Sequence, residues 1–173
     1  MKPTFALDHS EFEFADKLQH EFEKEHYSIL IPVSRQQKYF DLAILRLDDR
    51  LVKTFQVKSS RSYVTSRSDS RRFGIIMHGW FNPIKLDPKL DFLALMIYFP
   101  SAPNSQTWKR TSWDVTTIVM TPEKAKSYNM DYAKFYIGIT ESDDLVVCRS
   151  ITPVTSLKAS LFEHWLPLLK GTF

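Results

Sequence analysis

Apolar and polar residues follow two different periods along this chain, and together they predict a mixed α/β fold. Phe14, Leu18 and Phe22 recur every four residues, which is typical of the buried side of a helix. Ser10 precedes Glu13 at the spacing of a capping box, so a helix is predicted from about residue 10 to residue 26.

Segments rich in β-branched and aromatic residues follow this helix and predict strands. YSILIPV and YFDLAILRL come first, and the turn sequence LDDR at 47–50 leads into LVKTFQVKS. Further strands are predicted in RFGIIMHGWF, DFLALMIYF, WDVTTIVMT, KFYIGI and DLVVCRS, the second of which is apolar enough to be buried on both faces. TPEKAKSY and TSLKASLFEHWLPLL predict two later helices, and residues 59–72 and 100–110 predict loops.

The bulk composition favours one domain with one core. The chain has 173 residues, of which 43% are hydrophobic, and this length is short for two ordinary domains. The longest apolar run, 92–99, is well below the ~20 residues that cross a membrane, and the N-terminus turns acidic where a signal peptide needs an apolar core. The single cysteine, Cys148, lies in the apolar run LVVC and excludes an internal disulfide framework. We therefore expect a cytoplasmic protein without membrane contact.

Charge is unevenly distributed along the chain. Residues 8–25 carry seven acidic side chains against two lysines, whereas residues 53–72 carry six cations against Asp69 alone. The release of counter-ions makes such a basic segment a candidate for phosphate contacts, and the alternative is an ordinary solvated loop. The candidate contacts are Arg61, Arg67, Arg71 and Arg72, with Tyr63 as a stacking group and Lys85 and Lys89 as weaker candidates.

The stretch FQVKSS carries the candidate chemistry. Gln56 and Lys58 share one face of the predicted strand because side chains alternate along a strand. With an even loop such as Asp49-Arg50, cross-strand partners sum to 99, so that Asp41 lies opposite Lys58 and diagonal to Gln56. An odd loop would move Asp41 to the other face, and the constellation would then need a β-bulge. A carboxylate, an amide oxygen and an ammonium on one face suit a hard divalent cation beside a phosphate.

YFDLAIL, a turn and FQVKSS together resemble the PD-(D/E)XK, or restriction-endonuclease-like, nuclease superfamily. In that superfamily an Asp is followed, after a hairpin, by Glu or Gln, any residue and Lys, which Asp41, Gln56 and Lys58 match. The acidic leading helix and the later strand LDFLALMI also resemble Holliday-junction resolvases, and the resemblance covers roughly residues 8 to 100. No proline precedes Asp41, and Gln56 replaces the commoner Glu, which removes one negative charge from the site.

The resemblance implies a single domain over residues 1–173, built on a restriction-endonuclease-like mixed β-sheet core flanked by helices. It implies hydrolysis of DNA phosphodiester bonds with Mg²⁺ or Mn²⁺ and the release of a 5′-phosphate. By resemblance, Asp41, Gln56 and the Val57 carbonyl hold the metal, and Lys58 assists the attacking water. A homodimer is expected on the same family grounds.

A glutamate on the first helix often completes the site in this superfamily. Glu11 lies three and seven residues before Phe14 and Leu18, on the inward stripe at the helix start, and is the favoured candidate. Glu13 is accounted for as a capping partner, and Glu21 shares the stripe but lies deeper in the helix.

Two other interpretations stay open. The first is a nucleic-acid-binding or assembly module that keeps the nuclease fold without turnover, for which Gln56 is the motivating residue. The second is an unrelated α/β domain in which Asp41, Gln56 and Lys58 are scattered. Other chemistries find little support, because the five histidines lack metal-site spacing and the chain has no P-loop, dinucleotide fingerprint or G-x-S-x-G motif.

Overall fold

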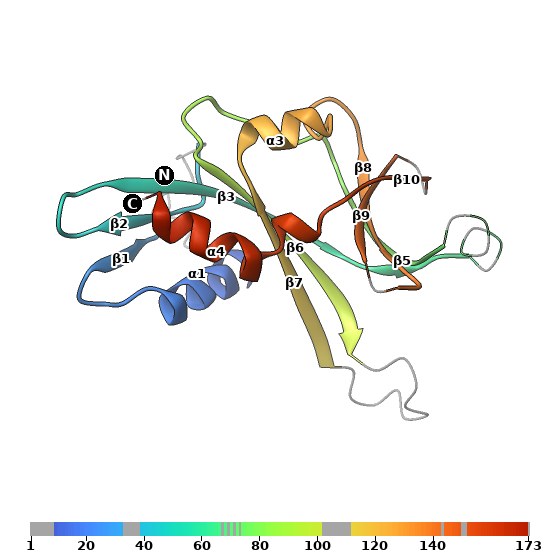
Figure 1. Ribbon diagram of the computed structural model, residues 1–173, viewed down its shortest axis with the longest axis horizontal. Coiled ribbons are helices and arrows are strands. Elements are labelled where there is room, and N and C mark those ends of the chain that lie inside the picture. The colour runs from blue at the N-terminus through green and yellow to red at the C-terminus, as the bar shows by residue number, and fades with distance from the viewer. Residues whose placement is uncertain are drawn as a thin grey trace, which may run out of the picture.

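The computed structural model describes residues 9–32, 39–66, 68, 70, 72, 74–101, 112–142, 144–149 and 152–172. The fold is mixed α/β, as the sequence predicts, but its strands form two five-stranded sheets (Figure 1). The sequence predicts a mixed β-sheet core flanked by helices; the first sheet is mixed, and the second sheet is not part of that prediction.

The first sheet has the strand order β1-β2-β3-β6-β7. Strands β1, β2 and β3 form an antiparallel meander, β6 runs parallel to β3, and β7 is antiparallel to β6. A parallel pair needs a long crossover, and here the crossover carries strands β4 and β5 of the second sheet. The bounds are β1 Tyr27–Leu30, β2 Leu42–Arg46, β3 Val52–Arg61, β6 Phe92–Ser101 and β7 Ser112–Met120.

The second sheet has the order β10-β9-β8-β5-β4, with every neighbouring pair antiparallel. The hairpin of β8 and β9 confirms the predicted late hairpin. Strand β10 replaces the start of the predicted closing helix, and β4 falls within the predicted loop at 59–72, because pairing with a neighbouring strand outweighs weak local propensity. The bounds are β4 Tyr63–Val64, β5 Ile75–Phe81, β8 Phe135–Thr140, β9 Leu145–Arg149 and β10 Thr152–Ser156.

Helices α1 (His9–Glu21) and α4 (Phe162–Gly171) cover one face of the first sheet (Figure 1). The short helix α3 (Pro122–Ser127) packs against the apolar core on the opposite face of that sheet. Helix α1 ends before the predicted residue 26, because the chain turns there to enter β1. The predicted cap of α3 is confirmed, since the Lys124 N–H donates to Thr121 Oγ1 over 3.3 Å. None of the helices in the described ranges is long and apolar enough to cross a membrane.

Two apolar cores lie on opposite faces of the first sheet. Phe55 and Val57 of β3 belong to the core beneath α1 and α4. The other core lies between the two sheets and includes Leu93, Leu95 and Ile97 of β6. The β3 residues in register with those three are Gln56, Lys58 and Ser60. Polar side chains of β3 therefore occupy the face that is apolar on the neighbouring strand.

Cys148 and the strand 92–99 behave as the sequence predicts. Cys148 is fully buried, and burial raises the pKa of its thiol to about 11. Strand β6 is buried on both faces, with only Tyr98 partly exposed among residues 92–99. A neutral, enclosed thiol supports a packing role for Cys148.

Replacing Gly79 of β5 with alanine is expected to lower the free energy of unfolding by about 1 kcal/mol. A Cβ at residue 79 would lie 3.2 Å from Ser60 Oγ and 3.3 Å from Ile97 Cγ2. Ser60 Oγ is held by the Trp80 N–H, and Ile97 is fully buried, so neither neighbour moves easily. Chemical denaturation measures the change. Gly171→Ala is the control, because nothing lies within 4 Å of its Cβ position, and an equal loss in both variants would contradict the close approach.

Candidate functional site

The hairpin that carries the motif has a different register from the predicted one. Leu42 pairs with Phe55, so partners sum to 97, and the prediction that Asp41 lies opposite Lys58 is wrong. The reason is the turn: the Arg46 N–H donates to the Leu51 carbonyl, which leaves four residues in the loop instead of two. A shift by an even number of residues keeps the same side chains on the same face.

The turn is fixed by its own charges. Arg46 and Asp49 form an ion pair, and Asp49 also accepts the Leu51 N–H. The hydrogen bond from Arg46 lowers the pKa of Asp49 to about 2. Arg50 adopts a positive φ of 61°, which closes the four-residue loop. Local turn chemistry thus sets the position of the motif residues at the far end of the hairpin.

Asp41 lies just before β2 and binds the part of β3 that extends beyond the start of β2. Its N–H donates to the Phe55 carbonyl over 2.7 Å, and its carboxylate Oδ2 accepts the Val57 N–H over 2.7 Å. Strand β2 begins only at Leu42, so the carboxylate takes the place of a strand partner for Val57. The Val57 carbonyl points to the same edge, because the N–H and C=O of one strand residue face the same neighbour.

Lys58 completes this contact. Its Nζ lies 3.6 Å from Asp41 Oδ2, and the Lys58 and Asp41 side chains are 42% and 23% exposed. The pair is open to solvent on one side, so the ammonium is accessible to an anionic ligand. Asp41 and Lys58 therefore lie together, contrary to the scattered arrangement of the second alternative interpretation.

Gln56 presents a buried acceptor beside this pair. Its Oε1 is buried and has no hydrogen-bond partner among the described residues. A buried amide oxygen without a partner is costly, which indicates that a water, an ion or a ligand completes it. Gln56 and Lys58 both line one groove.

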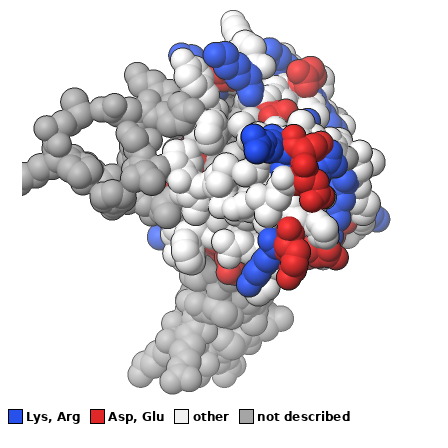
Figure 2. All heavy atoms as spheres, turned by 90° about the vertical axis from the view of Figure 1, so that its left-hand side faces the viewer, with Lys and Arg blue, Asp and Glu red and all other residues white. Residues whose placement is uncertain are grey.

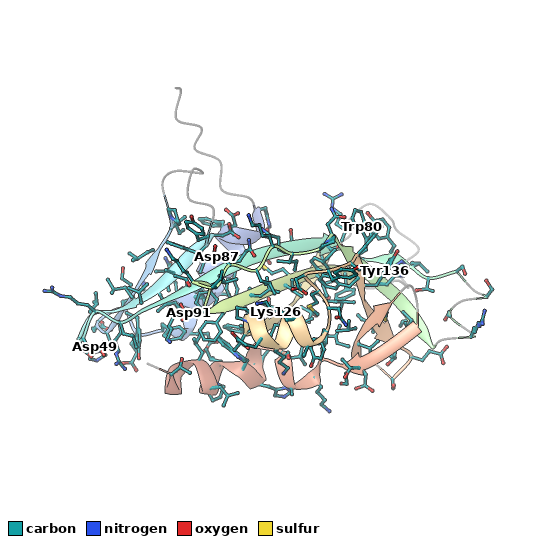
Figure 3. The ribbon with its side chains drawn as sticks, turned by 90° about the horizontal axis from the view of Figure 1, so that it is seen from above. Asp49, Trp80, Asp87, Asp91, Lys126 and Tyr136 are labelled. Atoms are coloured by element: carbon teal, nitrogen blue, oxygen red, sulfur yellow. The ribbon has the colours of Figure 1, made fainter. Side chains whose placement is uncertain are left out.

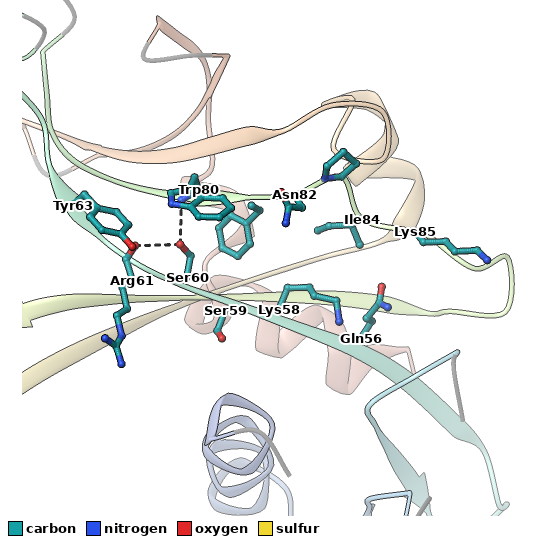
Figure 4. Close-up of a pocket in the computed structure, with 12 residues that line it drawn as sticks. Gln56, Lys58, Ser59, Ser60, Arg61, Tyr63, Trp80, Asn82, Ile84 and Lys85 are labelled. Carbon is teal, nitrogen blue, oxygen red and sulfur yellow. Dashed lines mark hydrogen bonds between the residues drawn. The ribbon is translucent and has the colours of Figure 1, made fainter. Parts of the chain in front are cut away.

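That groove, of about 530 Å³, lies between β3 and the segment from β5 to residue 85 (Figure 4). Lys58, Arg61 and Lys85 line it together with the aromatic residues Tyr63 and Trp80, and none of its described lining residues is acidic. Trp80 is not among the residues predicted from the sequence, because it lies in an ordinary strand segment and belongs to no motif. Its candidate role is indicated only by the exposure of its indole ring to solvent, which the structure shows. Arg61 and Tyr63 therefore line the same groove as Lys58, and their contact with nucleic acid stays a prediction.

The remaining basic candidates do not all join this groove. Arg67 and Arg71 lie outside the described residues, and Arg72 is exposed. Lys89 lies 5.6 Å from the ring centre of Tyr39, away from the groove. On the face that contains the β2–β3 turn, basic and acidic side chains lie side by side (Figure 2). The groove thus differs from that face in having cations and no acidic residue among its described lining residues, although Lys58 is paired with Asp41.

The helix glutamates are arranged differently from the expectation. Glu13 accepts a 2.7 Å hydrogen bond from the Tyr98 hydroxyl, and its carboxylate lies 3.4 Å from His9 Nδ1. Ser10 lies inside α1 and is buried, so the predicted capping box with Glu13 is wrong. The pKa of the Tyr98 hydroxyl is raised, mainly by burial and to a smaller extent by the hydrogen bond to Glu13. Glu11 is half-buried in the first turn of α1, and its role as a metal ligand stays a prediction.

Glu13 and Tyr98 line a second hollow, of about 680 Å³, that also includes His9, Ser59 and Arg61. Ser59 and Arg61 alternate with Lys58 and Ser60 along β3, so this hollow opens on the helix side of the strand. Three consecutive β3 residues, Ser59, Ser60 and Arg61, border both hollows. Glu13 lines this second hollow and not the groove of Gln56.

The role of Asp41, Gln56 and the Val57 carbonyl as metal ligands stays a prediction. The described residues contain no group of three or more His, Cys, Asp or Glu side chains that could hold a metal ion. One carboxylate, one buried amide oxygen and a main-chain carbonyl suffice for Mg²⁺, which keeps several waters.

No protein-family model, curated protein or solved structure matches this chain.

Proposed function

We propose that this protein is a metal-dependent endodeoxyribonuclease of the PD-(D/E)XK type. The observation that carries the proposal is the approach of Asp41 Oδ2 to Lys58 Nζ at 3.6 Å, together with the Gln56 amide oxygen, which has no hydrogen-bond partner among the described residues. The order of a leading helix, a hairpin with the motif and a later strand beside β3 also agrees with the resemblance. The restriction-endonuclease-like fold and the homodimer are part of this proposal.

Each residue has a role that follows from its chemistry. Asp41 and Gln56, with the Val57 carbonyl, would hold Mg²⁺ or Mn²⁺, and Glu11 is the proposed helix ligand. The bound ion would supply Lewis-acid polarisation of a phosphate oxygen and a more acidic water. Lys58 binds a non-bridging phosphate oxygen and stabilises the negative charge that builds during displacement. Water attacks phosphorus and loses a proton, the bond from phosphorus to the 3′ oxygen breaks, and that oxygen takes up a proton, which leaves a 5′-phosphate and a 3′-hydroxyl end.

A cleavage assay tests the proposal directly. The purified chain is incubated with supercoiled, linear, nicked, single-stranded and four-way-junction DNA in Mg²⁺, Mn²⁺ or EDTA. We expect metal-dependent cleavage of at least one of these substrates. If every DNA stays intact and calorimetry detects no binding of either metal, the nuclease proposal is wrong.

Gln56→Glu is expected to tighten Mg²⁺ binding, because a carboxylate outcompetes a neutral amide for a hard cation. The added charge also lies close to the Lys58 ammonium, which offsets part of its burial cost. Calorimetric titration with Mg²⁺ measures the change. Gln19→Glu, on the exposed side of α1, is the control, and weaker binding in the Gln56 variant would show that residue 56 is not a ligand.

A second candidate function is a nucleic-acid-binding module without turnover. The observation that favours it is that Asp41 Oδ2 already accepts the Val57 N–H and faces Lys58, which compete with a metal for the same oxygen. In that case DNA would bind equally well in EDTA and in Mg²⁺. The nuclease proposal instead requires that metal be bound and that cleavage follow.

A further inference from the structure

We infer that the groove beside Lys58 binds single-stranded DNA, with bases stacked on Tyr63 and Trp80 and phosphates held at its cationic end. The inference rests on the proposed function for its chemistry and adds the class of substrate. It means that the protein acts on DNA ends, junctions or other segments with unpaired bases, rather than on an intact duplex.

The aromatic end of the groove is open to solvent. Tyr63 is 51% exposed and Trp80 is 38% exposed, and both line the groove. Both come from the second sheet, where Trp80 of β5 is in register with Tyr136 of β8, and Figure 3 labels Trp80 and Tyr136 at the same end of the molecule. Exposed rings on a sheet are a common platform for unpaired bases, because every base has a face that can stack.

The platform is held in a defined position. The Trp80 backbone N–H donates to Ser60 Oγ over 3.1 Å, which ties β5 to β3. The Lys134 Nζ lies 4.1 Å from the Trp80 ring centre and 5.6 Å from that of Tyr136. A cation over the indole fixes the ring and also brings a positive charge to the backbone of a bound strand.

The other end of the groove suits phosphate. Lys58 and Lys85 lie there with Gln56, while Asn82 lies between them and Trp80 (Figure 4). Arg61 lies near the aromatic end. The Arg61 side chain points to the helix side of β3 (Figure 4), so Lys58 and Lys85 are the two groove cations that would meet a phosphodiester backbone, and none of the described lining residues is acidic. A strand that stacks on Trp80 would therefore pass its next phosphates toward the proposed catalytic end.

A single strand fits this arrangement better than a duplex. Stacking on a side chain needs a base face that is free, and in a duplex the base faces are covered by their neighbours. The groove volume of about 530 Å³ is within the range of ~300–1,000 Å³ that accommodates small ligands.

The test is binding without catalysis. Fluorescence anisotropy in EDTA measures the affinity of the whole chain for labelled oligo(dT) and for a duplex of equal length. We expect tighter binding to the single strand. Trp80→Ala is expected to weaken that binding about 5- to 100-fold, Tyr63→Ala to weaken it in the same direction, and Trp80→Phe to keep most of it.

Matched variants separate stacking from charge and from unfolding. Tyr132→Ala removes an aromatic side chain that is 87% exposed and outside the groove, and it should bind like the wild type. Lys85→Ala should flatten the dependence of log K on log salt by about 0.7, whereas Trp80→Ala should leave that slope unchanged. Circular dichroism confirms that each variant is folded.

The outcomes distinguish this inference from the proposed function. Equal affinity for single-stranded and duplex DNA, or wild-type binding by Trp80→Ala, would overturn the inference while leaving metal-dependent cleavage intact. Preferential single-strand binding that depends on Trp80, in a protein that never cleaves, would support the inference and reject the nuclease. An oligo(U) RNA that binds more tightly than oligo(dT) would overturn the choice of DNA.

Discussion

Lys58→Met is expected to lower the single-turnover rate of DNA cleavage by about 10²- to 10³-fold at saturating Mg²⁺, the effect of removing one preorganised charge-stabilising group. Methionine keeps most of the apolar stem and removes only the ammonium. Mg²⁺ binding should be retained or become tighter, because a cation 3.6 Å from Asp41 Oδ2 is lost. Rapid-quench cleavage and calorimetry measure the two effects separately.

Lys53 provides the matched control on the same strand. Its Nζ lies 3.6 Å from Asp91 Oδ1, so it forms an ion pair of the same length as Lys58 with Asp41. Lys53→Met should cleave at close to the wild-type rate. If Lys58→Met also cleaves at that rate, Lys58 is an ordinary lysine in a strand and has no part in catalysis.

Asp41→Asn is expected to abolish Mg²⁺ binding and cleavage together, while the protein stays folded. The amide keeps an oxygen that can accept the Val57 N–H, and it removes only the charge that a metal needs. Asp41→Ala should in addition lose stability of about 1–3 kcal/mol, because it leaves the Val57 N–H without a partner. The difference between the two variants isolates the structural role of Asp41 from its metal role.

Asp91 is the control for this variant. Its carboxylate accepts the Thr54 N–H over 2.9 Å and pairs with Lys53, which is the same pattern of contacts that Asp41 makes with Val57 and Lys58. Asp91→Asn should therefore bind Mg²⁺ and cleave like the wild type. Retained metal binding in Asp41→Asn would assign Asp41 a purely structural role at the edge of β3.

The candidate site could be predicted in part, because the alternation of side chains along a strand determines which of them share one face of the sheet. Alternation alone places Gln56 and Lys58 together, and an even turn keeps Asp41 beside them whether the loop has two or four residues. The exact partner was not readable, since it depends on the ion pair of Arg46 with Asp49 and on the conformation of Arg50. Turn geometry of that kind is set by contacts that a hydrophobic pattern does not encode.

The helix start was misjudged for a related reason. A capping box and an inward-facing carboxylate look alike in sequence, because both are a glutamate in the first turn of a helix. The choice is made by what the helix packs against. Here the Tyr98 hydroxyl, on a strand 85 residues away in the chain, donates a hydrogen bond to the Glu13 carboxylate. No local sequence pattern predicts that contact.

By itself, the sequence determined the mixed α/β class, most strands, the buried β6 and the shared face of Gln56 and Lys58, because these follow from short-range periodicity. Only the tertiary structure decided that the strands divide into two sheets and that β5 crosses close to β3 at Gly79. That crossing brings Trp80 of one sheet to Lys58 of the other. The groove exists because residues distant in the chain pack together, and such contacts depend on the whole fold rather than on any single segment.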